Sequence, residues 1–479
     1  MDNYGLQLES NGALPSNNVQ SPGATYLVYK RRYFVLFVVC LLNTANAVLW
    51  ISYAAVANFT DEFYCSSAEC GAANWLSLVF MIASIPMGFV AMWSVDKFGL
   101  RPGILLGSWA TLVGSSIRII SSIHSLPLSL RFPLVLFGQS IAACAQPFIM
   151  YLPTKLAALW FPENQRAIAN TFGSMSNPLG ILVAMVIGPQ IVHGSEDILI
   201  LNSVMAAPAA VVAVLATVGV CSSLPPTPPT ASAAQTSLSY WPGLKRALSV
   251  KAFLILTLAL GGGIGLFNSI YTMIQEILCP KGYSNSFAGL CGALLIVGGL
   301  IGSAISGLIV DKTHKFVLVS KLCYALAAIC ACAFSVIALR GGLAPAIAVL
   351  STLFGAFGFA IYPIGLEMGV ECTYPVAEAT SAGLIIISGQ VQGVIYVLLN
   401  QALTSKETSP LDEARQQCTE GKLTNVPVND WTLSLMVWCG IACCMAISFI
   451  ILFWPTLKRR QLEAAKKLLD ASTTPQSRH

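Results

Sequence analysis

Twelve apolar stretches separated by short polar segments constrain the fold of this chain more than any other feature. Each stretch has about 20 residues, which is enough to cross the hydrocarbon core of a bilayer as a helix. Only 10% of the 479 residues are charged, whereas soluble domains have about 25%. Because backbone groups in lipid must be satisfied within the protein, stretches of this length have to be helical. The sequence therefore predicts an all-α polytopic membrane protein.

We expect the helices at about residues 33–59, 73–94, 102–122, 131–152, 165–192, 198–220, 251–277, 287–310, 317–339, 343–366, 377–403 and 431–454. Residues 223–237, SLPPTPPTASAAQTS, divide them into two sets of six, and the prolines and small polar residues there are typical of a solvated linker. We therefore expect an N-terminal tail (1–32), a six-helix half (33–220), a linker (221–250), a second six-helix half (251–456) and a C-terminal tail (457–479).

The distribution of basic residues predicts the orientation in the membrane. Nineteen of the 26 Lys and Arg residues fall in one set of loops and the two tails, and basic loops are retained in the cytoplasm. Both tails and the linker are therefore expected to be cytoplasmic. Four cysteines, Cys65, Cys70, Cys279 and Cys418, fall on the opposite side, where a disulfide among them is plausible because that face is oxidising.

A short repeat links the two halves. WSVDKFGLRP begins at Trp93 and GLIVDKTHKF at Gly307, and each follows an apolar stretch. Such parallel repeats are typical of the major facilitator superfamily, and DKFGLR resembles its loop signature. We expect Asp96, Arg101 and Asp311 to act as gating residues that break and reform contacts between the halves. The alternative is a solvated loop with local ion pairs worth about 0–1 kcal/mol.

Polar and aromatic residues recur at helical spacing on several stretches. They are Asn43, Asn46, Trp50 and Tyr53 on the first, Gln139 and Gln146 on the fourth, Asn268, Tyr271 and Gln275 on the seventh, and Gln390 on the eleventh. Such amides avoid lipid, so each set should face protein or water. We favour a polar path between the halves. The alternative is hydrogen bonding between helices, worth about 0.6 kcal/mol per bond.

Two absences carry information about chemistry. No Asp, Glu, Lys or Arg lies securely in the middle of a predicted helix, and because a buried carboxylate is the usual proton relay, this favours facilitative, uncoupled transport. The four histidines lie in loops, helix ends or the tail, so a haem cavity built on histidine is not visible, although Cys or Tyr ligation stays open. No HExxH motif occurs, and we expect no enzymatic activity, no cofactor and no metal site.

The segments RRYFVLFVVCLLNTANAVLWISY, GQSIAACAQPF, KLAALWFPENQRAIAN, SNPLG and YPIGLEMGVECTYP resemble solute carrier family 49, the feline leukaemia virus subgroup C receptor-related carriers of the major facilitator superfamily. The resemblance implies twelve helices in two halves and transport of choline and ethanolamine or of haem. It assigns Trp50, Gln146 and Gln390 to the substrate site. The tyrosine that relatives carry on the seventh helix is Asn268 here, with Tyr271 one turn away.

Three functions follow as hypotheses. The first is a facilitative carrier of a small organic solute, which alternates access around Trp50, Tyr53, Gln146, Asn268, Tyr271 and Gln390. The second is a haem or porphyrin exporter, and the third is a membrane receptor or scaffold that transports nothing. For the carrier we expect a monomer in the plasma membrane, with a small-molecule substrate and the lipid bilayer as partners and no nucleic acid.

Overall fold

The computed structural model describes residues 27–65, 71–229, 240–313, 315–406 and 429–455. Twelve helices in these ranges are long and apolar enough to cross a membrane, as the sequence predicts. The first six spans are formed by α1 (Arg31–Ile51), α3 (Ala72–Phe98), α4 (Leu100–Ser121), α5 (Leu128–Trp160), α6 (Glu163–Ile191) and α7 (Ile198–Gly219). The second six are α9 (Lys251–Leu278), α10 (Asn285–Thr313), α11 (Phe316–Ile337), α12 (Ala344–Thr373), α13 (Glu378–Ala402) and α15 (Thr432–Leu452).

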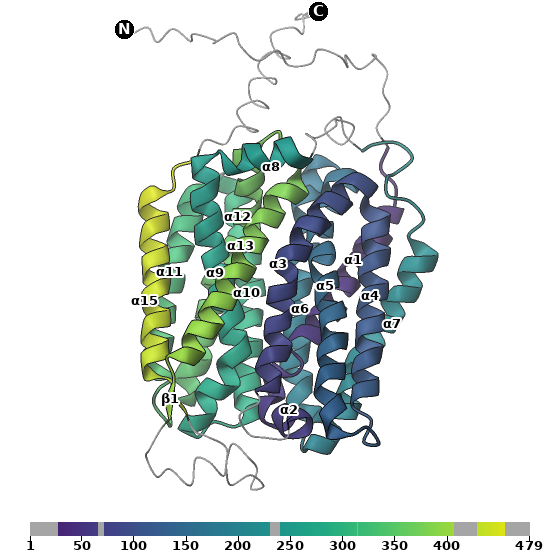
Figure 1. Cartoon of the computed structure of the whole chain (residues 1–479). Helices are drawn as coiled ribbons and strands as arrows, with labels where there is room; N and C mark the ends of the chain where they lie inside the picture. Colours follow the sequence, from purple (N-terminus) through teal and green to yellow (C-terminus); the bar gives the residue numbers. More distant parts are fainter. Residues whose placement is uncertain (1–26, 66–70, 230–239, 314, 407–428, 456–479) are drawn as a thin grey trace, which may run out of the picture.

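Short elements join these spans. They are η1 (Ala54–Val56), α2 (Ala57–Tyr64), η2 (Ser195–Asp197), α8 (Tyr240–Leu248), η4 (Cys279–Lys281) and the antiparallel pair of strands β1 (Ser405–Lys406) and β2 (Asn429–Asp430). Figure 1 shows α8 at one end of the bundle and α2 and β1 at the other. We call these the α8 end and the α2 end.

The first span is not one continuous helix, which the sequence did not predict. Helix α1 ends at Ile51, and the chain continues through η1 before α2 begins. Val56 leaves helical geometry altogether, with φ −136° and ψ 44°.

Two spans are longer than the sequence predicts. Helix α5 extends eight residues further than expected, to Trp160, and α12 extends seven residues further, to Thr373. Apolar residues mark only the part of a helix that lies in lipid. A prediction based on them therefore omits the helical turns that continue beyond the membrane.

Small residues allow close packing within each half. In α10 and α12, a Cβ added to Gly355 would lie 1.8 Å from the Leu295 carbonyl oxygen, and one added to Gly302 would lie 1.9 Å from that of Ala356. Glycines at such positions let membrane helices approach closely and gain van der Waals contact. Between the halves, α3 packs on α13 and α6 packs on α10. These two contacts frame the centre of the bundle.

Candidate functional site

A cavity lies between the two halves, about midway along the helices. It is lined from the first half by α1, α5 and α6 and from the second by α9, α11, α12, α13 and α15. The volume of the cavity is about 100 Å³. Seven lining residues are aromatic: Trp50, Phe267, Tyr271, Tyr324, Phe354, Phe359 and Tyr362. No Asp, Glu, Lys, Arg or His is among the described residues that line it.

Four of the six predicted site residues meet in this cavity: Trp50, Asn268, Tyr271 and Gln390. Trp50 donates its indole N–H to the Ser77 carbonyl oxygen at 3.2 Å, which fixes the ring. Asn268 Nδ2 lies 3.5 Å from Gln390 Oε1, so these two amides form one polar edge. Helices from both halves therefore supply the aromatic and polar groups.

Two buried polar groups in the lining are free to bind a ligand. The Tyr271 hydroxyl and Asn177 Nδ2 both lack a hydrogen-bond partner in the described part of the structure. An unpaired buried donor costs about 1–3 kcal/mol, so each gains from a solute or water placed beside it. Asn177 was missed by our sequence reasoning, although an Asn before Pro178 inside an apolar helix is an unusual signal.

The structure places Tyr53 outside the cavity. Its hydroxyl donates to Asn202 Oδ1 at 2.8 Å and accepts a hydrogen bond from Arg118 Nε at 3.1 Å. The predicted face assumed helical spacing from Trp50 onward, but α1 ends at Ile51. Beyond that break, Tyr53 no longer shares a face with Trp50.

Gln146 lies beside the cavity without being part of its lining. Its Oε1 accepts a hydrogen bond from Ser84 Oγ at 2.9 Å, while its Nε2 has no partner among the described residues. Met150, one turn along α5, does line the cavity.

Other predicted amides bond helices together instead of lining the cavity. Asn43 Nδ2 donates to the Ile149 carbonyl oxygen at 3.4 Å, and Asn46 Nδ2 donates to that of Ala142 at 3.0 Å. Gln139 Nε2 donates to the Leu49 and Leu76 carbonyl oxygens, each at 3.1 Å. For these three residues, the preference for a polar path was wrong. The alternative of hydrogen bonding between helices was correct.

A buried arginine, which sequence reasoning missed, holds the break in the first span. Arg118 is 1% exposed and donates to the Leu49 carbonyl oxygen at 2.8 Å and to Ser52 Oγ at 2.7 Å. It also bonds Asn202 Oδ1 at 3.1 Å and lies over the Tyr53 ring, 4.3 Å from its centroid. Ends of helices leave carbonyl groups unpaired, and here a guanidinium satisfies one of them inside the bundle.

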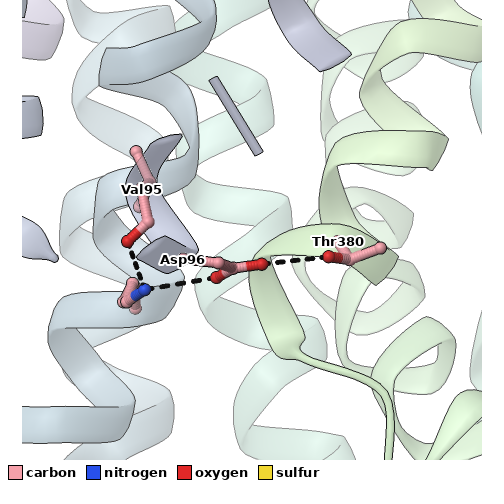
Figure 2. Close-up of polar contacts among 4 residues, drawn as sticks. Val95, Asp96 and Thr380 are labelled. Carbon is pink, nitrogen blue, oxygen red and sulfur yellow. Dashed lines mark hydrogen bonds and ion pairs between the residues drawn. The ribbon is translucent and has the colours of Figure 1, made fainter. Parts of the chain in front are cut away.

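The predicted gating residue Asp96 bridges the halves at the α8 end (Figure 2). Its Oδ1 lies 3.2 Å from Lys155 Nζ, and its Oδ2 accepts a hydrogen bond from Thr380 Oγ1 at 3.1 Å. Lys155 also donates to the Val95 carbonyl oxygen. Asp96 also affects Tyr240 on α8. Burial is the larger cause that raises the pKa of the Tyr240 hydroxyl, and the negative charge of the Asp96 carboxylate raises it further.

The other two predicted gating residues are not seen in such a contact. Arg101 is exposed, and its backbone N–H donates to Ser223 Oγ at 3.0 Å. Asp311 lies in the last turn of α10, and its side chain falls outside the described part of the structure. At the α2 end, a different pair joins the halves, since Asn74 Nδ2 donates to Glu276 Oε1 at 2.6 Å. Polar contacts thus connect the halves on both sides of the cavity.

The expectation of a disulfide among the four cysteines is supported. Cys65 and Cys279 are both disulfide-bonded. Cys70 and Cys418 lie outside the described residues.

Comparison with known proteins places this architecture in a family. The model of the Major Facilitator Superfamily matches residues 33–397. The Solute carrier family 49 member A3 of Xenopus tropicalis is 42% identical, over 91% of this chain and 89% of that protein. The Choline/ethanolamine transporter flvcr2a of Danio rerio is 30% identical, over 83% of this chain and 85% of that protein.

A solved D-xylose-proton symporter shares the fold, with a TM-score of 0.63 at 13% identity, over 89% of this chain and 98% of the other. The family match covers both halves, and the twelve spans surround a central cavity. The chain is therefore a membrane transporter of the major facilitator superfamily and belongs to solute carrier family 49.

Proposed function

We propose that the transporter carries a small organic solute with an ammonium group, of the choline and ethanolamine class. One observation carries the proposal: the cavity is lined by seven aromatic residues and by no charged residue among those described. Aromatic faces attract an ammonium group by about 0.5–2 kcal/mol each, more when water is excluded, and need no carboxylate to do so. An anionic solute would find no cation among the described lining residues.

Tyr271 supports this reading because it lies in the same cavity as Trp50. Relatives that resemble this chain carry a tyrosine at the position of Asn268. In this chain the tyrosine is Tyr271, one turn further along α9, and its ring centroid lies 6.2 Å from that of Phe267. The Tyr271 hydroxyl and the amides of Asn268 and Gln390 then offer hydrogen bonds to the hydroxyl end of the solute. Trp50 and Gln390 keep the roles that the resemblance implies.

A haem or porphyrin is the second candidate. Tyr271, Tyr324 and Tyr362 line the cavity and could ligate iron. Against it, the two propionates of haem require cations or water, and the described lining holds no Lys, Arg or His. The ammonium solute fits both the aromatic rings and the absence of charge.

The proposed mechanism is alternating access. The contact between Asp96 and Thr380 closes the α8 end, and the contact between Asn74 and Glu276 closes the α2 end. Breaking one while keeping the other would open the cavity to one side. Arg101 and Asp311 are proposed to adjust the α8 end. We propose that this end is cytoplasmic together with both tails, that the protein works as a monomer in the plasma membrane, and that it has no enzymatic activity.

Transport should be facilitative, because no carboxylate lines the cavity in the described residues to couple a proton to the solute. The test is uptake of labelled choline and ethanolamine into proteoliposomes that contain the purified protein, compared with empty liposomes. We expect saturable uptake that unlabelled choline inhibits. Its neutral carbon analogue, 3,3-dimethylbutan-1-ol, has the same shape without the charge and should inhibit weakly.

Two results would contradict the proposal. The first is uptake of choline and ethanolamine no higher than in empty liposomes. The second is equal inhibition by choline and by its neutral analogue. Haem efflux from cells that express the protein, together with the first result, would favour the porphyrin candidate.

A further inference from the structure

Three cysteine thiols meet where α11 packs against α15. The Sγ atom of Cys332 lies 3.0 Å from that of Cys439 and 3.2 Å from that of Cys443. All three sulfur atoms lie within 4.8 Å of one another, and each side chain is half-buried. We call Cys332, Cys439 and Cys443 the thiol cluster. Transport as proposed above uses none of them.

The spacing of the cluster suits a metal ion. Cys439 and Cys443 are four residues apart on α15, so they lie on one face a single turn apart. The same spacing places two ligands of helical metal sites on one ion. Cys332 completes the set from the facing helix. A trigonal ion about 2.3 Å from each sulfur requires sulfur separations of about 4 Å, so the two short separations of 3.0 and 3.2 Å would have to widen by up to about 1 Å when the ion binds.

The surroundings favour one class of metal. Neighbouring Ala331 and Ala442 are buried, while Ile329 and Ile447 are exposed on the lipid-facing surface of the same helices. With three sulfur ligands, the site selects a soft ion of low coordination number. A divalent ion that seeks a fourth oxygen or nitrogen ligand would not find one in the cluster.

We propose that the thiol cluster binds one cuprous ion. Cysteine binds a metal as the thiolate, so entry of the ion releases the protons of the ligating thiols to solvent. The thiolate charge offsets that of the monovalent cation, which favours the ion in an apolar environment. No oxidation or reduction takes place when the ion enters in its reduced form.

The bound ion would tie together two helices that also line the central cavity. Ala327 and Ala328 on α11 and Ala442 on α15 belong to that lining. Ala442 is the residue before Cys443, and Ala328 is one turn before Cys332. Metal occupancy would therefore fix the packing of one cavity wall, whichever solute the carrier moves.

The test uses the full chain, purified in detergent under reducing conditions and exposed to cuprous ion buffered by a competing chelator. Copper retained per protein is measured after desalting. We expect about one copper in the wild type and a loss of about tenfold or more in affinity for Cys332→Ser, because the shared ligand is gone. Cys330→Ser on α11 and Cys444→Ser on α15 are matched controls, since neither residue belongs to the cluster, and both should retain the ion.

X-ray absorption at the copper edge of the wild type gives a readout that does not depend on a variant. The expected spectrum shows sulfur ligands only. Equal retention in the wild type and a folded Cys332→Ser, copper bound through oxygen or nitrogen, or no stoichiometric copper in the wild type would each overturn the proposal. If Cys332→Ser fails to fold, the wild-type stoichiometry and spectrum decide alone.

Discussion

Asp96 on α3 accepts a hydrogen bond from Thr380 on α13 at 3.1 Å, across the boundary between the two halves. The same carboxylate lies 3.2 Å from Lys155 in its own half. Lys155 orients the carboxylate. If the hydrogen bond from Thr380 breaks, the charge of Asp96 is still paired with Lys155. This arrangement suits a contact that must form and break in each transport cycle.

Replacing Thr380 by valine keeps the shape of the side chain and removes the hydroxyl. The lost hydrogen bond is worth about 1 kcal/mol, so the open form of the α8 end should gain about fivefold in population. Hydrogen exchange of the backbone near Asp96 and Thr380 should become faster. Lys245→Ala is the control, because that side chain is exposed and the described hydrogen bond at this residue uses only its backbone carbonyl. Unchanged exchange in Thr380→Val would show that this bond does not hold the end closed.

Arg118→Met should destabilise the protein strongly. The variant leaves the Leu49 carbonyl oxygen, Ser52 Oγ and Asn202 Oδ1 without their charged donor. Hydrogen bonds to charged groups contribute about 1.5–3 kcal/mol each, so a loss of several kcal/mol is expected even after relaxation. The melting temperature in detergent measures it. Lys245→Ala, an exposed substitution in α8, should melt like the wild type. Similar melting of both variants would exclude a structural role for the buried network.

Gly355→Ala should separate α10 from α12. The added Cβ would meet the Leu295 carbonyl oxygen at 1.8 Å, and backbone cannot move aside as a flexible side chain can. Overpacking of this kind costs about 1–3 kcal/mol or more. Gly440→Ala offers a matched control on α15, because no neighbouring atom of the described residues lies within 4 Å of the added atom. The melting temperature should fall for Gly355→Ala only. An equal effect of the two substitutions would point to helix propensity and not to packing.

The described cavity lining contains no carboxylic acid, and we therefore expect transport without proton coupling. With the membrane potential held at zero, a pH gradient should not concentrate choline inside proteoliposomes. Internal choline should reach the external concentration and stop there. Accumulation that follows the direction of the pH gradient would show coupling to protons and would contradict facilitative transport.

The sequence predicts the spans well and the site only in part, for physical reasons. Apolarity decides which segments enter lipid, so all twelve helices could be predicted. Trp50, Asn268 and Gln390 could be assigned to one cavity because each lies in a regular helix. Tyr53 could not be placed, because α1 ends at Ile51, where Arg118, which is distant in sequence, donates to the Leu49 carbonyl oxygen.

The amides show a second limit of sequence reasoning. Asn46 and Asn268 have the same chemistry, and both lie among apolar residues. Only the packing of neighbouring helices decides that Asn46 bonds Thr111 and Ala142 while Asn268 faces the cavity. Helical spacing tells which residues share a face, but not what that face contacts.

The central claim is that Trp50 binds an ammonium solute, and choline uptake by Trp50→Ala tests it most directly. The variant should lose about 2 kcal/mol of binding, a decrease of roughly thirtyfold in kcat/KM, and Trp50→Phe should fall between it and the wild type. Trp75→Ala is the matched control, because Trp75 is 50% exposed on the outer face of α3. We expect wild-type uptake for Trp75→Ala and near loss of uptake for Trp50→Ala at equal amounts of protein. Wild-type choline uptake by folded Trp50→Ala would contradict the central claim.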